Sequence, residues 1–261
     1  MSFKELAPNY HMRLKRVIEL AGSGKRVLDV GCGDGFLALQ LKKNFKEVYG
    51  VDVNEIDLAI ARRINPKKQV HFIKASATNL PFKNEFFDVV ICTDVIEHIK
   101  EDEKVVSEVR RVLKKNGTLI ITTLDKNFPF LYDPINYVLM RLLNKHLPIG
   151  VWGFGHVKLY GNKDIINLLK GFKVKKIIKD PHVLTAFIEN YYFVNLLQPS
   201  LKSDPKNKER TLKNIRTLEK RILSKPPRAL VQIRDLFIKL DNFFYKDKDI
   251  GINLIAKAVK R

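Results

Sequence analysis

The sequence predicts a single α/β domain built around an open, mostly parallel sheet, and three observations support this fold class. Val27, Leu28 and Val30 form an apolar run that suits a strand covered on both faces, and a glycine-rich turn follows it directly. Further strand-like segments alternate with helical patterns along the chain. With 261 residues, 45% of them hydrophobic, the chain can form one such domain, residues 1–261, with helical elaborations.

The turn after the first strand is the most informative segment. Gly31, Gly33 and Gly35 let the backbone turn sharply and approach a ligand at a point where a Cβ atom would collide. A dinucleotide-binding turn follows the pattern G-x-G-x-x-G/A, with a small residue at its sixth position. Phe36 stands there in this chain. The turn is therefore predicted to bind a nucleoside ligand that is not a dinucleotide.

Two acids flank this turn and indicate the charge of its ligand. Asp29 and Asp34 would repel the phosphates of a dinucleotide. S-adenosylmethionine carries a sulfonium and an ammonium group and has no phosphate, so the same acids would attract it. The sequence therefore predicts an S-adenosylmethionine site at the end of the first strand.

The second predicted strand, residues 48–52, ends in Asp52. In nucleoside-binding sheets an acid about 20 residues after the glycine turn accepts hydrogen bonds from the ribose hydroxyls. We predict this role for Asp52. The alternative is that Asp52 caps a helix that begins near Asn54.

The remaining elements follow in order. Strands are predicted at residues 70–74, 87–92, 118–123, 173–179 and 252–259, and helices at residues 101–113, 134–143 and 162–169. Asn116 and Gly117 give a helix-stop and turn signal. The apolar stripe of the helix that begins at Pro134 is predicted to lie in the core, with a lid or a membrane-facing surface as the alternative. Residues 127–147 form a helical insertion after the fifth strand.

A second helical insertion is predicted between strands six and seven. Residues 180–250 carry helical patterns at 186–197, 209–223 and 229–244, punctuated by proline-containing segments. We expect this insertion to cover the acceptor site and not to form an independent domain.

Five segments together resemble a known family. They are VLDVGCGDG (27–35), VYGVD (48–52), NLPF (79–82), FDVVICTDVIEH (87–98) and LKKNGTLIIT (113–122). In this order they resemble the core of the class I S-adenosylmethionine-dependent methyltransferases, in the branch that includes quinone-biosynthesis and natural-product enzymes. The resemblance implies a Rossmann-like sheet of seven strands whose last strand is antiparallel, with the cofactor S-adenosyl-L-methionine at the C-terminal ends of strands one to four.

The resemblance also implies a set of cofactor-binding residues. The glycines would lie beside the methionyl part, Asp52 would hold the ribose, and the acceptor and sulfonium would lie beside the end of strand four. The expected residues are Asp29, Gly31, Cys32, Gly33, Gly35, Asp52, Val53, Ser76, Ala77, Thr93 and Asp94. Ser76 stands where relatives often have an acid that accepts a bond from the adenine amine, and a hydroxyl is a weaker acceptor than a carboxylate.

Methyl transfer needs a base only when the acceptor must lose a proton. The candidate catalytic residues are His156, on a glycine-flanked loop, and His98, after the fourth strand, with His11 as a further candidate base. Tyr10, which we place before the first helix, is the candidate positioning group because its ring face could contact a sulfonium.

Charge and cysteine content bear on partners and location. The formal net charge is +20, and basic residues concentrate between Lys202 and Lys239. A solvated helix face is the simplest interpretation, and an RNA-binding surface or a surface for anionic membranes is the alternative. The two cysteines, Cys32 and Cys92, are predicted to be buried thiols, so no metal site is expected. With no signal peptide or membrane-spanning run, a cytoplasmic protein is expected.

The sequence therefore predicts an S-adenosylmethionine-dependent methyltransferase that acts on a small-molecule or lipid-like acceptor. Alternatives are an RNA methyltransferase that uses the basic surface, a non-catalytic S-adenosylmethionine-binding protein, and a nicotinamide oxidoreductase. Phe36 and the flanking acids disfavour the last of these.

Overall fold

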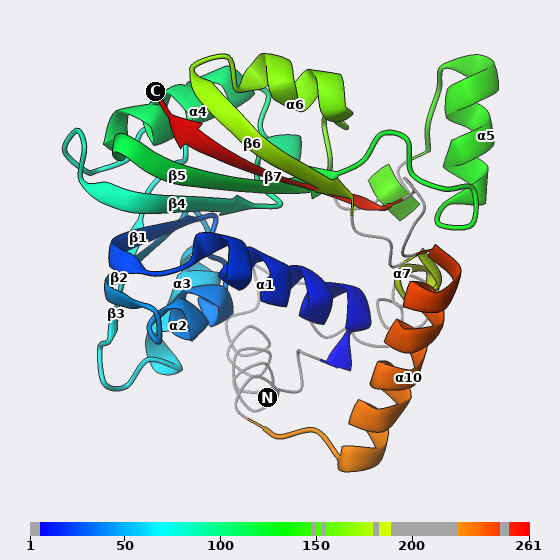
Figure 1. The fold of residues 1–261 in the computed structure, drawn as a ribbon, viewed down its shortest axis with the longest axis horizontal. Coiled ribbons are helices and arrows are strands. Elements are labelled where there is room, and N and C mark those ends of the chain that lie inside the picture. Colours follow the sequence, from blue (N-terminus) through cyan, green and yellow to red (C-terminus); the bar gives the residue numbers. More distant parts are fainter. Residues whose placement is uncertain (1–5, 148–149, 153–154, 180–182, 189–223, 246–250) are drawn as a thin grey trace, which may run out of the picture.

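A seven-stranded sheet forms the centre of the structure (Figure 1). The structure is a computed structural model that describes residues 6–147, 150–152, 155–179, 183–188, 224–245 and 251–261. The strands are β1 (Gly24–Val30), β2 (Phe45–Asp52), β3 (Val70–Lys74), β4 (Phe87–Thr93), β5 (Leu113–Leu124), β6 (Phe172–Lys179) and β7 (Asn253–Lys260). Their order is β3-β2-β1-β4-β5-β7-β6, and β7 runs antiparallel to β5 and β6 while β1 to β5 pair in parallel. The predicted fold class is confirmed.

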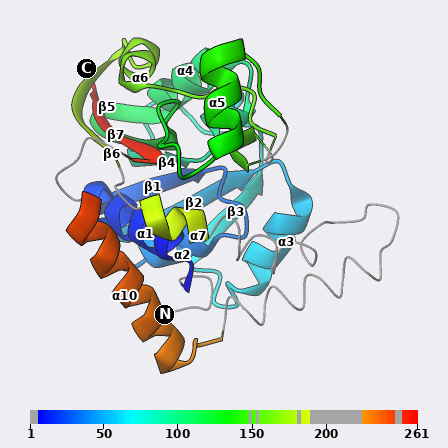
Figure 2. The same ribbon diagram turned by 90° about the vertical axis from the view of Figure 1, so that its right-hand side faces the viewer.

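Helices cover both faces of this sheet (Figures 1 and 2). One face carries α1 (Pro8–Ala21), α2 (Phe36–Leu41) and α3 (Glu55–Arg63), whose apolar residues pack on Val27, Val48 and Ile91. The other face carries α4 (Asp102–Val112) and α6 (Asn162–Leu168). Because the central strands are covered on both sides, β1 and β4 bury apolar residues on both faces, such as Val27 and Leu28 or Val89 and Val90.

The junction of α4 and β5 differs from the prediction. The helix ends at Val112 and β5 begins at Leu113, so Asn116 and Gly117 lie within the strand's bounds. Asn116 has a φ of 63°, and the pairing with β4 jumps from Leu113 to Thr118. The turn signal is therefore real, but it marks a bulge at the start of β5 and not the end of the helix.

The prediction that the apolar stripe of α5 (Pro134–Leu143) lies in the core is wrong. Ile135, Val138 and Leu142 are exposed, Leu142 by 75%. Asn136 is the residue that α5 buries completely; its side-chain amide donates to Asp133 over 2.8 Å. Polar anchoring therefore orients the helix, and its apolar stripe faces outward.

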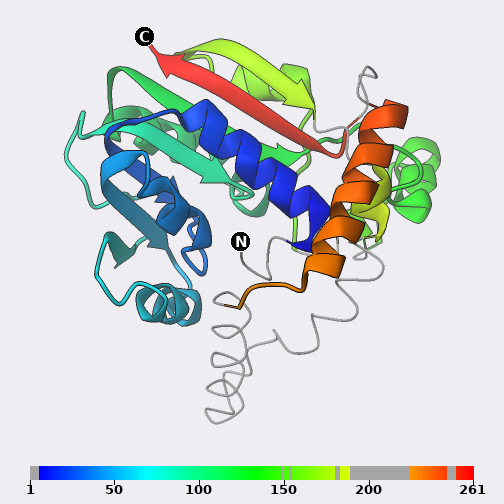
Figure 3. The ribbon, with the colours of Figure 1, turned by 60° about the horizontal axis from the view of Figure 1, so that its bottom comes forward.

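The described part of the second insertion packs beside α1. It comprises α7 (Val183–Ile188) and α10 (Arg228–Tyr245), and Figure 3 shows α10 next to the N-terminal end of α1. The buried carboxylate of Asp241 on α10 accepts hydrogen bonds from the backbone amides of Leu184 and Thr185, which joins the two helices. The helix predicted at 209–223 lies outside the described residues. None of the helices in the described part of the chain combines the length and apolar character needed to cross a bilayer.

Candidate functional site

The glycine turn follows β1 and adopts the backbone conformation for which its glycines are suited. Gly31, Gly33 and Gly35 have φ values of 71°, 51° and 76°. A Cβ atom on Gly31 would lie 2.3 Å from the Cγ2 atom of Val95, so this position has no room for a side chain. The turn is held to the next strand because the amides of Gly31 and Cys32 both donate to the carbonyl of Val51.

Asp52, at the end of β2, faces the same turn. One carboxylate oxygen accepts a hydrogen bond from the amide of Gly33, and the other accepts one from the amide of Asn54, both at 2.8 Å. The N-cap of α3 is Asn54, whose side chain accepts from the amide of Ile56. The helix-capping alternative for Asp52 is therefore wrong. Each carboxylate oxygen has a second lone pair, so Asp52 can still accept from a ligand.

Two cavities lie at the C-terminal ends of the central strands, and both are lined by Gly31 and Asp94. The first, of about 290 Å³, lies under α1 and carries the acids Asp29, Asp34 and Asp57. The second, of about 430 Å³, runs past the ends of β2 and β3. The two cavities therefore adjoin each other at Gly31 and Asp94.

The predicted cofactor-binding residues divide between the two cavities. Cys32, Gly33 and Thr93 line the first, and Asp52, Val53, Ser76 and Ala77 line the second. Gly35 lines neither; the Cβ atom it lacks would collide with Phe72, so it serves the packing of the turn. The hydroxyl of Ser76 contacts that of Thr78 at 2.8 Å. Burial raises the pKa of the Cys32 thiol, so this group stays neutral and does not act as a nucleophile.

Asp94 is the most constrained residue of the site. Its φ is 54°, an uncommon backbone conformation for a residue other than glycine that recurs at functional sites. One carboxylate oxygen accepts from the hydroxyl of Thr122 at 2.9 Å, and the other lies 2.7 Å from the guanidinium of Arg13 on α1. The sequence interpretation missed Arg13. Its position three residues after Tyr10, on the same side of a helix, is the signal that could have revealed it.

Tyr10 and His11 lie within α1 and not before it, which corrects the predicted helix start. Tyr10 lines the first cavity and packs against Phe36, with ring centroids 6.4 Å apart. His11 lines neither of the two cavities. The structure therefore brings Tyr10 to the site and gives no such position to His11.

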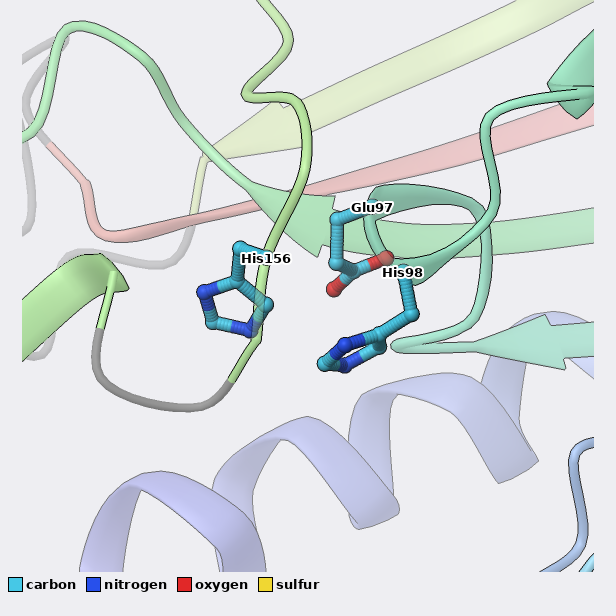
Figure 4. Close-up of side chains that lie close together, drawn as sticks. All are labelled: Glu97, His98 and His156. Carbon is cyan, nitrogen blue, oxygen red and sulfur yellow. The ribbon is translucent and has the colours of Figure 1, made fainter. Parts of the chain in front are cut away.

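His98 and His156 come together from two distant segments of the chain (Figure 4). His98 ends the 3₁₀ turn η2 (Ile96–His98) and lines the second cavity. His156 lies on the loop after η3 (Gly150–Trp152), and the centroids of the two rings are 4.6 Å apart. The carboxyl of Glu97 lies between them, and one ligand atom from each of the three residues falls within 4.8 Å of the other two.

The electrostatics of this cluster are unusual. Burial, together with the nearby charge of Asp94, raises the pKa of Glu97 to about 8. Burial also lowers the pKa of His156, and the neighbouring His98 adds to this effect. Both shifts favour the uncharged forms of Glu97 and His156 near neutral pH. Glu97 was not predicted as a site residue, although it directly precedes the candidate His98.

Contacts around the buried residues Asp102 and Tyr160 position the loop that carries His156. The hydroxyl of Tyr160 donates to the carboxylate of Asp102 at 2.6 Å, and the ammonium of Lys158 lies 2.7 Å from the same group. The amide of Val157 donates to the carbonyl of Glu97 at 2.7 Å. The segment that follows His156 is therefore attached both to η2 and to the start of α4.

Comparison with known proteins adds independent evidence. Residues 28–121 match the family described as a methyltransferase domain. The ubiquinone biosynthesis O-methyltransferase of Aliivibrio fischeri is 32% identical over 130 residues, which cover 48% of this chain and 56% of that protein. The chain thus spans a little over half of the length of this relative.

Two solved structures show how far the fold is shared. Phosphoethanolamine N-methyltransferase 2 of Haemonchus contortus, solved in complex with S-adenosyl-L-methionine, aligns with a TM-score of 0.59 at 20% identity, covering 95% of this chain and 52% of that one. The PH0226 protein of Pyrococcus horikoshii aligns with a TM-score of 0.52 at 29% identity, covering 66% of this chain and 85% of that one.

Proposed function

We propose that the chain is a class I S-adenosylmethionine-dependent methyltransferase that transfers a methyl group to an oxygen of a lipid-like acceptor; the methyltransferase-domain match and the similarity to a ubiquinone biosynthesis O-methyltransferase support this. The observation that carries this proposal is the pair of cavities lined in common by Gly31 and Asp94. One cavity is rich in acids and suits a cationic amino-acid group, and the other carries the acceptor atoms that suit a nucleoside.

The residues present fit the cofactor. Gly31 allows the turn a positive φ and a close approach to Val95 that a side chain would prevent, and Asp29 and Asp94 supply negative charge to the first cavity. Asp52 is positioned to accept hydrogen bonds from ribose hydroxyls, and the segment of Ser76 and Ala77 borders the space for the adenine. When bound, S-adenosylmethionine supplies the activated methyl group. We assign to Tyr10 the role of covering the cationic end of this space.

The protein's contribution to the reaction is mainly alignment. Methyl transfer requires the acceptor atom to lie in line with the methyl group, and such positioning is worth up to about 7–11 kcal/mol. Asp94, held by Thr122 and Arg13, forms a rigid border between the cofactor space and the acceptor side. His98 and His156 lie on the acceptor side, where a neutral imidazole can receive the proton of an acceptor hydroxyl.

The acceptor's apolar character is inferred from α5. Its exposed face carries Ile135, Val138, Leu142 and Leu143, and such a patch is uncommon on a protein that contacts only water. Val151 links this helix to His156. Its amide donates to Asp133 at the N-terminus of α5, and its carbonyl accepts from the ring of His156. An acceptor that partitions into membranes would be presented along this face.

The test is methyl transfer to paired acceptors. Purified protein with radiolabelled S-adenosylmethionine would be offered hydroxylated aromatic compounds that differ only in the presence of a long apolar tail, with anionic vesicles added. We expect label in the tailed compound and little in its tail-free partner. Equal labelling of both would refute the lipid-like acceptor, and labelling of bulk RNA alone would favour the RNA alternative.

A further inference from the structure

We propose that Glu97, His98 and His156 form a binding site for a divalent transition-metal cation on the acceptor side of the cofactor cavities. The inference rests on the proposed function for its chemical role, but the cation site itself can be tested separately. It departs from the sequence prediction of no metal, which depended on the cysteines. The three ligands come from two segments far apart in the sequence, so their proximity follows only from the fold.

The first argument is the buried carboxyl of Glu97. This residue is only 1% exposed, and neither of its carboxyl oxygens has a hydrogen-bond partner of good geometry in the described part of the chain. The buried hydroxyl of Thr123 lies close enough to this carboxyl to lower its pKa, but not in the geometry of a full hydrogen bond. Burying a polar group without a partner costs free energy, and an ionised carboxylate costs far more. The carboxyl points toward the space between the two imidazoles, where a cation would compensate for its burial (Figure 4).

The second argument is the orientation of the histidines. The Nδ1 atom of His156 contacts the carbonyl of Val151, and the Nδ1 atom of His98 lies 3.4 Å from the carbonyl of Gly155. A carbonyl can only accept, so Nδ1 is the donor in both contacts. In a neutral ring the Nε2 atom then carries the lone pair. This arrangement, with one ring nitrogen donating to a backbone carbonyl, is the usual support of a metal-binding histidine.

The third argument is distance and ligand type. The three ligand atoms lie within 4.8 Å of one another. Metal–ligand bonds of about 2.0–2.2 Å place ligand atoms about 3.3 Å apart in a tetrahedron, so binding requires side-chain movements of the order of 1.5 Å. Two imidazole nitrogens and one carboxylate oxygen suit Zn²⁺, Mn²⁺ or Fe²⁺ better than Mg²⁺ or Ca²⁺.

A cation held by three protein ligands keeps at least one position open. His98 borders the cavity assigned to the nucleoside, so an acceptor hydroxyl bound at this open position would lie next to the cofactor space. Coordination lowers the pKa of a hydroxyl by stabilising the oxyanion, and the proton leaves to solvent. The cation would thus fix the acceptor oxygen in place and bring it to its reactive form.

The test measures cation binding directly. The full chain would be treated with a chelator, desalted and titrated with Zn²⁺ by calorimetry. The variants would be Glu97→Gln, His98→Ala and His156→Ala, with His71→Ala as the matched control because this exposed histidine on β3 stacks against Tyr49 outside the cluster. We expect one Zn²⁺ per wild-type chain, at least ten-fold weaker binding in each cluster variant, and unchanged binding in the control. Co²⁺ in place of Zn²⁺ should give visible absorption bands that the cluster variants lose.

Absence of stoichiometric Zn²⁺ binding by the wild type would overturn the inference, as would unchanged affinity in both histidine variants. These two variants keep the test valid even if Glu97→Gln impairs folding. Zn²⁺ binding without methyl transfer would leave the cation site standing while the proposed function fails. Methyl transfer by a chelator-treated chain that binds no Zn²⁺ would support the proposed function and overturn the cation site.

Discussion

Replacement of Asp52 tests the assignment of the ribose contact. In the structure its carboxylate accepts hydrogen bonds from the amides of Gly33 and Asn54, and it borders the second cavity. A charge-assisted hydrogen bond contributes about 1.5–3 kcal/mol. Loss of the bonds to a ribose in Asp52→Ala should therefore weaken S-adenosylhomocysteine binding at least ten-fold, and up to about a hundred-fold. Isothermal calorimetry measures this change as a ratio of Kd values.

Two further variants separate the ribose contact from local folding. Asp52→Asn keeps one oxygen that can accept from a backbone amide, so it should preserve the turn better than alanine and still lose the charge. Asn54→Ala removes the N-cap of α3, which should cost about 1 kcal/mol of unfolding free energy, but Asn54 does not line the cavities. Its Kd should match that of the wild type. If Asp52→Ala binds as the wild type does, or if Asn54→Ala weakens binding equally, the reasoning is refuted.

Three other variants test separate parts of the structure. Gly31→Ala should abolish measurable cofactor binding in calorimetry. The new methyl group would lie 2.3 Å from the Cγ2 atom of Val95, and the backbone at this position has a positive φ that alanine disfavours. Wild-type affinity would contradict the geometry of the turn. Tyr160→Phe should lower the unfolding free energy by about 1.5–3 kcal/mol in urea titrations, because the buried carboxylate of Asp102 loses a 2.6 Å hydrogen bond; a change below about 0.5 kcal/mol would show that the bond contributes little. Leu142→Ser on α5 should reduce sedimentation with anionic vesicles and leave thermal stability nearly unchanged, and unchanged sedimentation would argue against a membrane-facing role for this helix.

The elements that the sequence predicted well are those whose signals are local. Strand β1 and the turn after it depend on apolar residues and glycines that are adjacent in the chain, and β3 has the predicted bounds of residues 70–74. The family prediction also depended on such segments, and residues 28–121, which contain most of them, match the methyltransferase-domain family. The antiparallel seventh strand was predicted from the resemblance and is confirmed.

The features that the sequence predicted wrongly or missed share a physical cause: each depends on contacts between residues far apart in the chain. The periodicity of α5 gave an apolar face but not its direction, which is set by the buried pair of Asp133 and Asn136. Arg13 and Glu97 were missed because their importance lies in partners from other elements. His98 and His156 were both predicted, but for separate roles, and only the folded loop shows that their rings lie 4.6 Å apart.

The most direct measurement of the central claim is a crystal structure of the chain with S-adenosylhomocysteine. We predict electron density that runs through the space bordered by both Gly31 and Asp94, with the ribose hydroxyls within hydrogen-bond distance of the Asp52 carboxylate and the sulfur facing the side on which His98 and His156 lie. Density for the ligand at any other place in the molecule, with this space empty, would contradict the account.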